Sequence, residues 1–183
     1  MSKAIFWDLQ GTLGGEATAD INLFEPFEFA KKALQITKNE GFRNIIITNQ
    51  SRIGKGLLSL EDYEREAQKI ITFFNNECTL IDDFLCCPHK SEDECECKKP
   101  KIALIMRSVE KYSLSVKECY VIGDIAKNEI LMAHNAGCKG ILVLTGGGKD
   151  SLGRFRSTWA GYEADLITEN AFTAAKAIAN GSV

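Results

Sequence analysis

Short apolar runs alternate along the chain with longer segments whose apolar residues recur at helical spacing. The runs are typical of buried β-strands and the longer segments of amphipathic helices, so the alternation predicts βαβ units around a parallel sheet. The first run, KAIFW, is almost entirely apolar, which indicates burial on both faces of that sheet. The predicted strands are residues 3–7, 44–48, 82–87, 119–123, 140–146 and 164–168.

Helix boundary signals lie between these runs. Pro26 lies near the start of one predicted helix, and Gly41 ends that helix. Ser59, followed by an acidic first turn, is typical of the N-cap of another helix. Gly137 ends another helix. The predicted helices lie within residues 24–41, 59–77, 101–113 and 128–137. Residues 146–163 form the longest irregular stretch and are expected to be a mobile loop.

These elements predict one α/β domain over residues 1–183, a Rossmann-like three-layer α/β/α sandwich with a mostly parallel sheet. No repeat, low-complexity tract or flexible linker divides the chain. The segment after Leu13 is too short for a large cap domain, so loops alone are expected to border the ligand site.

Composition narrows the class of protein. The chain is 45% hydrophobic and 26% charged, with a net charge of −3, which gives no reason to expect a nucleic-acid or anionic membrane partner. No apolar stretch approaches the ~18 residues of a membrane span, and the amino terminus does not resemble a signal peptide. We therefore expect a cytoplasmic monomer or small homo-oligomer that acts on a small molecule.

Cysteines and one of the two histidines gather in a single segment. Four of the seven cysteines lie within residues 86–97, a clustering that indicates metal binding rather than disulfides in a cytoplasmic protein. The other three, Cys78, Cys119 and Cys138, lie outside this segment and are expected to be buried small hydrophobic residues.

Polar side chains follow several of the predicted strands. Asp8 follows the first strand, Thr48 ends the second, and Asp124 follows the fourth. Ligands of parallel α/β sheets bind at the carboxyl ends of the strands, so these groups are expected to converge. Two carboxylates suit Mg²⁺, and the nearby lysines of CKKP suit a phosphoryl group that an aspartate could accept. Each aspartate alone would be read as a helix cap or a turn residue.

Four motifs in order resemble those of the haloacid dehalogenase superfamily: DLQGTL, ITNQS, KKP and VIGDIAKNE. The resemblance is closer to its D-glycero-D-manno-heptose bisphosphate and histidinol phosphatases. That branch has TNQSGIARG where this chain has TNQSRIGKG, and a zinc insert similar to CPHKSEDECECKKP. The resemblance covers Lys3 to about Thr168.

The resemblance implies a magnesium-dependent phosphatase with a covalent aspartyl-phosphate. Asp8 would be the nucleophile, while Thr48 and Lys99 would hold and neutralise the phosphoryl group. Mg²⁺ would bind Asp8, Asp124 and the backbone carbonyl of Gln10. The substrate would be a small phosphorylated metabolite, similar to a sugar phosphate or to histidinol phosphate.

Four further residues are implied to contact the substrate: Asn49, Gln50, Ser51 and Lys98. Lys98 stands where the family usually has arginine. A lysine cannot present the bidentate fork of a guanidinium, so the substrate of this chain is expected to differ from the family's usual substrate.

The same resemblance identifies residues 86–98 as a zinc-binding loop. Its ligands would be Cys87, His89, Cys95 and Cys97, with Cys86 as an alternative to Cys87. Three thiolates and one imidazole fill a tetrahedral Zn²⁺ site and leave no open position, so the zinc would be structural. Free surface thiols are the competing interpretation.

Gln10 departs from the family pattern. The residue two positions after the nucleophile is usually an aspartate that transfers protons to the leaving group and from water, help worth ~10²–10⁴-fold. Gln10 cannot titrate, so hydrolysis is expected to be slowed, unless the leaving group needs no proton. In the last motif Asn128 occupies a frequent aspartate position, and Glu129 fits the looser spacing of the superfamily.

Two other hypotheses remain open at this stage. A catalytically impaired protein that binds a phosphorylated ligand or has a regulatory role would account for Gln10 and Asn128. A zinc-organised interaction module would leave the convergent strand-end residues unexplained. The intact Asp8 favours the enzyme.

Overall fold

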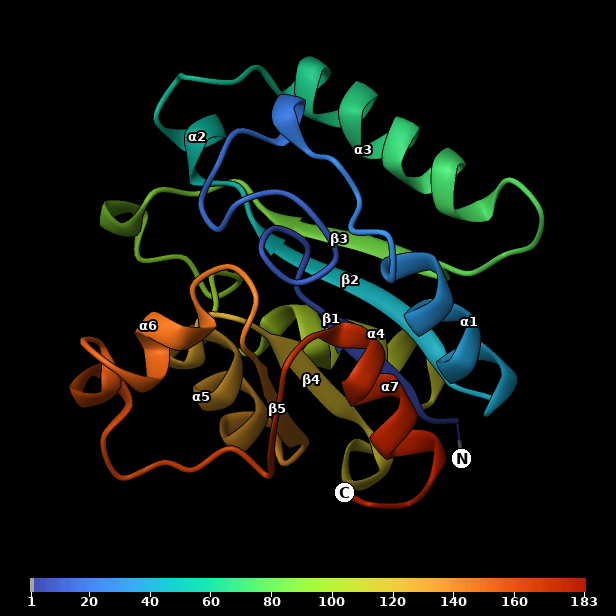
Figure 1. Ribbon diagram of the computed structural model, residues 1–183. Coiled ribbons are helices and arrows are strands. Elements are labelled where there is room, and N and C mark those ends of the chain that lie inside the picture. The colour runs from blue at the N-terminus through green and yellow to red at the C-terminus, as the bar shows by residue number, and fades with distance from the viewer. Residues whose placement is uncertain (1) are drawn as a thin grey trace.

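The computed structural model describes residues 2–183. Its strands span Ala4–Trp7 (β1), Arg43–Asn49 (β2), Asp83–Cys87 (β3), Tyr120–Gly123 (β4), Lys139–Val143 (β5) and Leu166–Thr168 (β6). They form one sheet in the order β3-β2-β1-β4-β5-β6, and every pair is parallel (Figure 1). The parallel sheet predicted from the alternating pattern is confirmed.

Helices cover both faces of this sheet. The α-helices are Ala30–Asn39 (α1), Ser51–Gly54 (α2), Leu60–Asn75 (α3), Ala103–Tyr112 (α4), Ala126–Ala136 (α5), Gly148–Leu152 (α6) and Ala171–Ala179 (α7). Short 3₁₀ turns lie at Ile21–Leu23 (η1), Ser91–Asp93 (η2), Val116–Glu118 (η3) and Arg156–Trp159 (η4). Among the residues described, no helix combines the length and hydrophobicity needed to cross a bilayer.

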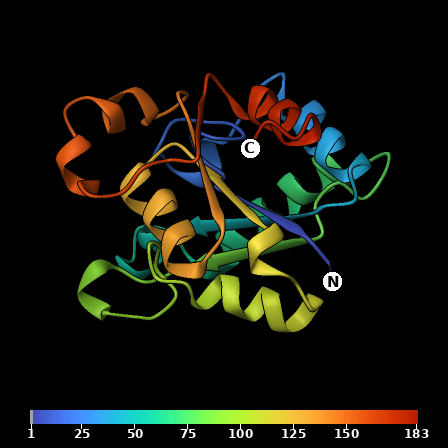
Figure 2. The same ribbon diagram turned by 90° about the horizontal axis from the view of Figure 1, so that it is seen from below.

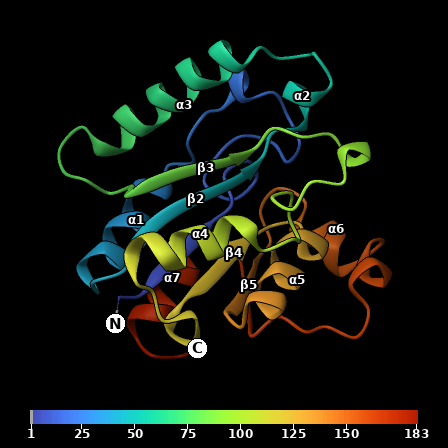
Figure 3. The same cartoon turned by 180° about the vertical axis from the view of Figure 1, so that it is seen from behind.

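The alternation of side chains along β1 divides the core into two layers. Ile5 and Trp7 pack in a cluster with α1, α3 and α7, whereas Ala4 and Phe6 pack in a second cluster with α4 and α5. Figure 2 shows the sheet between its helical layers, and Figure 3 shows the face covered by α4 and α5. The three-layer sandwich is confirmed, and β1 lies at its centre with both faces buried, as its composition predicts.

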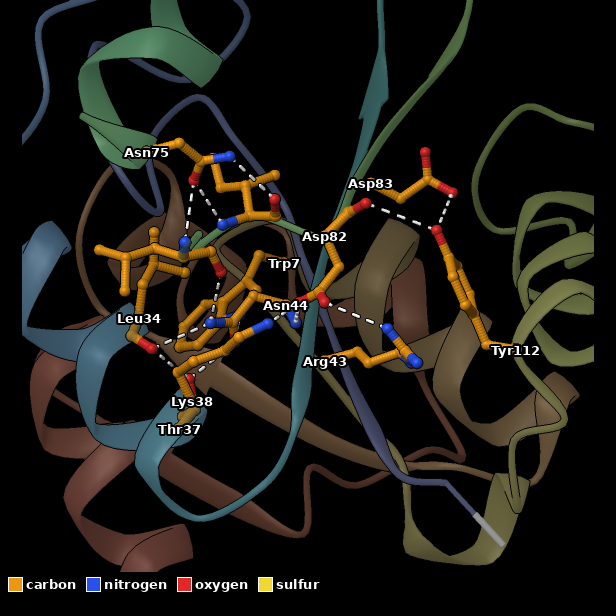
Figure 4. A network of polar contacts seen from close by, with 12 residues as sticks. Trp7, Leu34, Thr37, Lys38, Arg43, Asn44, Asn75, Asp82, Asp83 and Tyr112 are labelled. Atoms are coloured by element: carbon orange, nitrogen blue, oxygen red, sulfur yellow. Dashed lines mark hydrogen bonds and ion pairs between the residues drawn. The ribbon is translucent and has the colours of Figure 1, made fainter. Parts of the chain in front are cut away.

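A buried polar residue ties the layers together at the amino-terminal end of the sheet. Asn44 on β2 is fully buried, and its Oδ1 accepts hydrogen bonds from Trp7 Nε1 (3.0 Å) and Thr37 Oγ1 (2.7 Å) (Figure 4). Its Nδ2 donates to the carbonyl oxygens of Leu34 and Leu80, each at 2.9 Å. These four bonds link β1, β2, α1 and the segment before β3, at the end opposite to the strand ends that carry the predicted site.

Several boundaries follow local signals. Ser59 Oγ accepts the backbone N–H of Asp62 at 3.0 Å, which confirms the predicted cap of α3. Gly137 adopts φ +77° at the end of α5, a conformation that glycine adopts without strain.

Three expectations are wrong. α1 begins at Ala30, because Pro26 pairs with Gly14 in an isolated bridge instead of starting the helix. Residues 146–163 contain α6 and η4 rather than an irregular loop, and the buried Trp159 anchors them. Cys78 is exposed rather than buried, while Cys119 is buried as expected and Cys138 is half-buried.

Candidate active site

The carboxyl ends of the central strands bring the predicted catalytic residues together. β1 lies between β2 and β4, so Asp8 after β1, Thr48 near the end of β2 and Asp124 after β4 occupy neighbouring positions. The chain places β2 and β3 on one side of β1 and β4 to β6 on the other, which makes the β1–β4 boundary the switch point of the sheet. All three side chains are buried.

Lys99 is held between two carboxylates. Its Nζ lies 2.5 Å from Asp8 Oδ1 and 2.8 Å from Glu129 Oε1, and it donates to the carbonyl oxygen of Ile47 at 3.0 Å. These contacts use all three ammonium hydrogens. Burial alone would lower the pKa of Lys99, but the Asp8 and Glu129 carboxylates raise it above its ordinary value, so the ammonium stays charged.

Glu129, rather than Asn128, reaches the site. The Glu129 side chain is buried, and its second oxygen accepts the backbone N–H of Ile125 at 3.0 Å. Asn128 is half-buried and makes no side-chain hydrogen bond within residues 2–183. Burial raises the pKa of Glu129 to about 7, Lys99 opposes this shift, and Asp8 adds to it.

Asp124 is buried against two glycines. Its Oδ2 accepts the backbone N–H of Gly147 at 2.6 Å, and a Cβ atom on Gly11 or Gly146 would collide with its carboxylate. Both glycines have positive φ, +86° and +50°, so the turns leave room for this side chain. Burial, with the charges of Asp8 and Glu129, raises the pKa of Asp124 to about 8.

The charge balance and one orphaned oxygen fit a divalent cation. Asp8, Asp124 and Glu129 bring three carboxylates together with the single ammonium of Lys99. Asp124 Oδ1 is buried without any hydrogen-bond partner in the described chain. Buried carboxylate oxygens require a partner, and oxygen ligands suit Mg²⁺. Asp8, Asp124 and the backbone carbonyl of Gln10 are therefore compatible with a magnesium site.

Gln10 is part of a closed amide network rather than a free polar group. Its Nε2 donates to the carbonyl oxygen of Ala19, and its Oε1 accepts from Gln50 Nε2 at 2.8 Å. Gln50 Nε2 also donates to Thr48 Oγ1 at 2.9 Å. The buried Gln10 side chain thus joins the segment before η1 to the end of β2.

Three of the predicted substrate contacts, Asn49, Ser51 and Lys98, make hydrogen bonds that position the loop carrying Lys99. Asn49 Oδ1 accepts the backbone N–H of Lys99 at 3.1 Å, and Asn49 Nδ2 donates to the Lys99 carbonyl at 3.4 Å. Lys98 Nζ donates to Ser51 Oγ and to the carbonyl oxygen of His89 at 3.2 Å. Lys98 and Ser51 therefore lie together, and one N–H of the Lys98 ammonium is left over.

Two contributors were not singled out from the sequence. Thr12 is buried and its Oγ1 donates to Asp8 Oδ2 at 3.3 Å. Ser151 is also buried; its Oγ donates to the Asp124 carbonyl at 2.9 Å and accepts the Ala126 N–H at 3.1 Å. Thr12 could have been found from its place in DLQGTL, whereas Ser151 carries no local signal because it lies in a segment without periodicity.

The segment that carries Ser151 braces the Asp124 turn. Trp159 Nε1 donates to the Ser151 carbonyl at 2.8 Å, and the Arg156 guanidinium lies 3.9 Å from the Trp159 ring centroid. α6 and η4 therefore hold Ser151 against the Asp124 carbonyl and the first turn of α5.

The predicted zinc ligands come together beside this site. One ligand atom from each of Cys87, His89, Cys95 and Cys97 lies within 4.8 Å of all the others. The two closest pairs are His89 Nδ1 with Cys97 Sγ at 3.2 Å and Cys87 Sγ with Cys95 Sγ at 3.5 Å. Such spacing fits four ligands around a tetrahedral Zn²⁺. The cluster excludes Cys86, which points to the other face of β3 and packs with the α1–α3–α7 core.

Comparison with known proteins relates this arrangement to hydrolases. The sequence pattern of a family described as HAD-hydrolase-like matches residues 96–170. The chain is 31% identical over 148 residues to the D-glycero-beta-D-manno-heptose-1,7-bisphosphate 7-phosphatase of Helicobacter pylori, covering 79% of this chain and 84% of that protein. It is 36% identical over 146 residues to the histidine biosynthesis bifunctional protein HisB of Blochmanniella floridana, covering 76% of this chain but only 40% of that longer protein.

A solved structure has the same fold. The D,D-heptose 1,7-bisphosphate phosphatase from B. bronchiseptica, complexed with magnesium and phosphate, superposes with a TM-score of 0.86 over 99% of both chains at 22% identity. The likeness at this identity concerns the fold, whereas the match to the Helicobacter pylori enzyme extends along most of both sequences. On that similarity, and with the HAD-like pattern over residues 96–170, this chain belongs to the haloacid dehalogenase-like phosphatases.

Proposed function

We propose that this protein is a magnesium-dependent phosphatase of a small phosphorylated metabolite and works through an aspartyl-phosphate on Asp8. The observation that carries the proposal is the Lys99 ammonium between Asp8 and Glu129, beside the unpartnered oxygen of Asp124. A helix cap or a turn would need neither the buried lysine nor three neighbouring carboxylates. One domain would carry this activity, with residues 86–98 as its zinc loop.

Asp8 is arranged to act as the nucleophile. Lys99 binds its Oδ1, and Thr12 donates to its Oδ2 at the longer distance of 3.3 Å, so the second oxygen is the less tightly held. That oxygen would attack phosphorus. Lys99 and the Thr48 hydroxyl would offset the charge on the phosphoryl oxygens during transfer. A Mg²⁺ ion held by Asp8, Asp124 and the Gln10 carbonyl would supply further positive charge.

Gln10 is expected to slow the reaction. Its amide does not titrate near neutral pH and cannot act as a general acid or base, and both ends of that amide already have partners. A reaction that needs general acid–base help would lose ~10²–10⁴-fold. Binding of the phosphoryl group does not depend on that help.

The relatives suggest the substrate class. The Helicobacter pylori relative bears the name D-glycero-beta-D-manno-heptose-1,7-bisphosphate 7-phosphatase, so the proposed substrate is a sugar phosphate, with a histidinol-phosphate-like compound as the alternative. Lys98 would meet the far side of such a molecule through its remaining N–H. We further propose that Cys87, His89, Cys95 and Cys97 bind a structural Zn²⁺ and that the protein is a cytoplasmic monomer or small homo-oligomer.

A second candidate is a binding or regulatory protein that retains the pocket without useful turnover. The closed network around Gln10 favours it, because an amide in place of an acid preserves structure without proton transfer. The two candidates differ in whether phosphorus becomes bonded to Asp8.

The test is to incubate the purified protein with Mg²⁺ and a panel of phosphate esters and acyl phosphates, then measure phosphate release and locate any phosphorylated residue by mass spectrometry. Asp8→Asn should abolish both signals. Asp150→Asn is the matched control, because Asp150 is a surface residue paired with Arg154. Turnover that survives Asp8→Asn would refute the nucleophile. Tight phosphate binding without any Asp8-dependent transfer would favour the binding protein.

A further inference from the structure

The side chains around Asp8 include few groups that could give a proton to a leaving group. Within residues 2–183, Lys99 is the one ionisable side chain hydrogen-bonded to Asp8, Gln10 or Gln50. Its three hydrogens are taken by Asp8, Glu129 and the Ile47 carbonyl. Transfer of any of them would break an ion pair or a buried hydrogen bond, so Lys99 is a poor proton donor.

Three other ionisable groups near the site also have partners, and the unpartnered Asp124 Oδ1 is the oxygen proposed to bind Mg²⁺. Glu129 has its two oxygens on Lys99 and on the Ile125 N–H, at the base of the site. Asp20, next to Ala19, has Oδ1 on Asn22 and Oδ2 on Arg52 at 2.9 Å. His89 lies within the cysteine cluster. None of these side chains is free to approach a leaving group without losing its contacts.

Gln10 occupies the position where the family usually has a proton-transferring aspartate. Its Nε2 donates to the Ala19 carbonyl and its Oε1 accepts from Gln50, so this amide links the segment before η1 to the end of β2. An aspartate here is one methylene shorter and has no hydrogen to donate to the Ala19 carbonyl. The hydrogen bonds to Ala19 and Gln50 therefore require a side chain of the length and polarity of glutamine.

Resting on the aspartyl-phosphate chemistry of the proposed function, and in place of the phosphate esters that the relatives suggest, we propose that the site is specialised for acyl phosphates, mixed anhydrides of phosphoric and carboxylic acids, whose leaving group departs as a stable carboxylate without a proton. Lys98 suits this product, because it pairs with Ser51 at the edge of the site and keeps one N–H to donate to an anion.

The reaction balances without a protein acid. An Asp8 oxygen forms a bond to phosphorus, the bond between phosphorus and the acyl oxygen breaks, and its electron pair leaves with the carboxylate. Aspartyl-phosphate is itself an acyl phosphate, so one such anhydride replaces another in this step. Water then forms a bond to phosphorus, Asp8 leaves as a carboxylate, and the proton of water passes to phosphate or to the solvent.

The experiment compares two substrates that differ in the leaving group. We would measure kcat/KM with Mg²⁺ for acetyl phosphate and for ethyl phosphate, in the wild type, Gln10→Asp and Gln10→Asn. The ratio of the two values should be at least ~100-fold larger in the wild type than in Gln10→Asp, because only the aspartate can protonate ethoxide. Gln10→Asn shortens the side chain without adding an acid, so it should retain the wild-type ratio even where its absolute rate falls.

Controls separate this inference from the proposed function. Gln68→Asp introduces the same change on the exposed face of α3 and should leave the ratio unchanged. A wild type that hydrolyses both substrates equally well, or a ratio that Gln10→Asp does not alter, would overturn the preference for acyl phosphates while leaving the nucleophile intact. A wild type that is silent on acetyl phosphate would also overturn it, even if Gln10→Asp gains Asp8-dependent activity. If neither protein transfers phosphate to Asp8, the proposed function fails as well.

Discussion

Replacing Asp124 with asparagine should stabilise the magnesium-free protein even though it damages the proposed cation site. Asp124 is fully buried near Asp8 and Glu129, and within residues 2–183 the Lys99 ammonium alone offsets these carboxylates. Burial and the two neighbouring carboxylates raise the pKa of Asp124 from 3.8 to about 8. Asparagine has almost the same shape, keeps an oxygen for the Gly147 N–H, and carries no charge.

The size and the sign of the effect follow from this shift. A carboxyl whose pKa is raised by folding binds more protons in the folded state, so its contribution to stability falls as pH rises between the two pKa values. One pKa unit corresponds to ~1.4 kcal/mol, so an ionised Asp124 would cost at most roughly 5 kcal/mol at pH 8. Local relaxation reduces that figure, and we expect Asp124→Asn to raise the free energy of unfolding by about 2–5 kcal/mol there. At about pH 4 the difference should vanish.

The assay is thermal unfolding in magnesium-free buffer at a series of pH values. A chain of this size gains roughly 2–4 °C per kcal/mol, so the variant should melt at least about 4 °C above the wild type at pH 8. Added Mg²⁺ should raise the melting temperature of the wild type and not that of the variant. A variant that is less stable than the wild type at pH 8, or a difference that does not change with pH, would refute the reasoning. Asp150→Asn, on the surface, is the control.

Three further predictions concern other parts of the molecule. Ser151→Ala should leave the Asp124 carbonyl and the Ala126 N–H buried without partners, lowering the free energy of unfolding by about 1–3 kcal/mol and weakening magnesium-dependent stabilisation, whereas the exposed Ser157→Ala should do neither. The protein should bind one equivalent of Zn²⁺ in a titration by elemental analysis, and Cys97→Ser should reduce that stoichiometry while Cys78→Ser, on the surface, should not. Asn44→Ala should cost about 3 kcal/mol in chemical denaturation, because it orphans Trp7 Nε1 and the Leu80 carbonyl and removes a bond to the Leu34 carbonyl; a loss below 1 kcal/mol would contradict the role given to that network.

The strands were predictable because they are buried on both faces and therefore apolar throughout. The β-branched run before Thr48 and the apolar run before Asp8 identify β2 and β1 to within a residue, and the polar residues after them mark the strand ends. α6 and η4 were not predictable, because the contact between Trp159 and Ser151, and not a local periodicity, holds them. α7 was missed although Asn170 caps it through two backbone N–H groups, a signal that the sequence does carry.

The candidate site divides in the same way. The order of elements along the chain predicts which residues lie at the strand ends, namely Asp8, Thr48 and Asp124. Which side chain each of them touches does not, because hydrogen-bond partners depend on orientations that only the folded chain determines. Gln10 with Ala19, and Asn49 with the Lys99 backbone, are contacts of this kind.

The central position of β1 also governs when the site can exist during synthesis. β1 emerges from the ribosome early, but its partner β4 pairs Tyr120 with Ile5 and is made much later. Until then a nascent chain holds Asp8 without Asp124 or Glu129, so the three carboxylates are not forced together while the chain is incomplete. The electrostatic crowding of the finished site therefore arises only once β4 and the residues after it have joined the sheet.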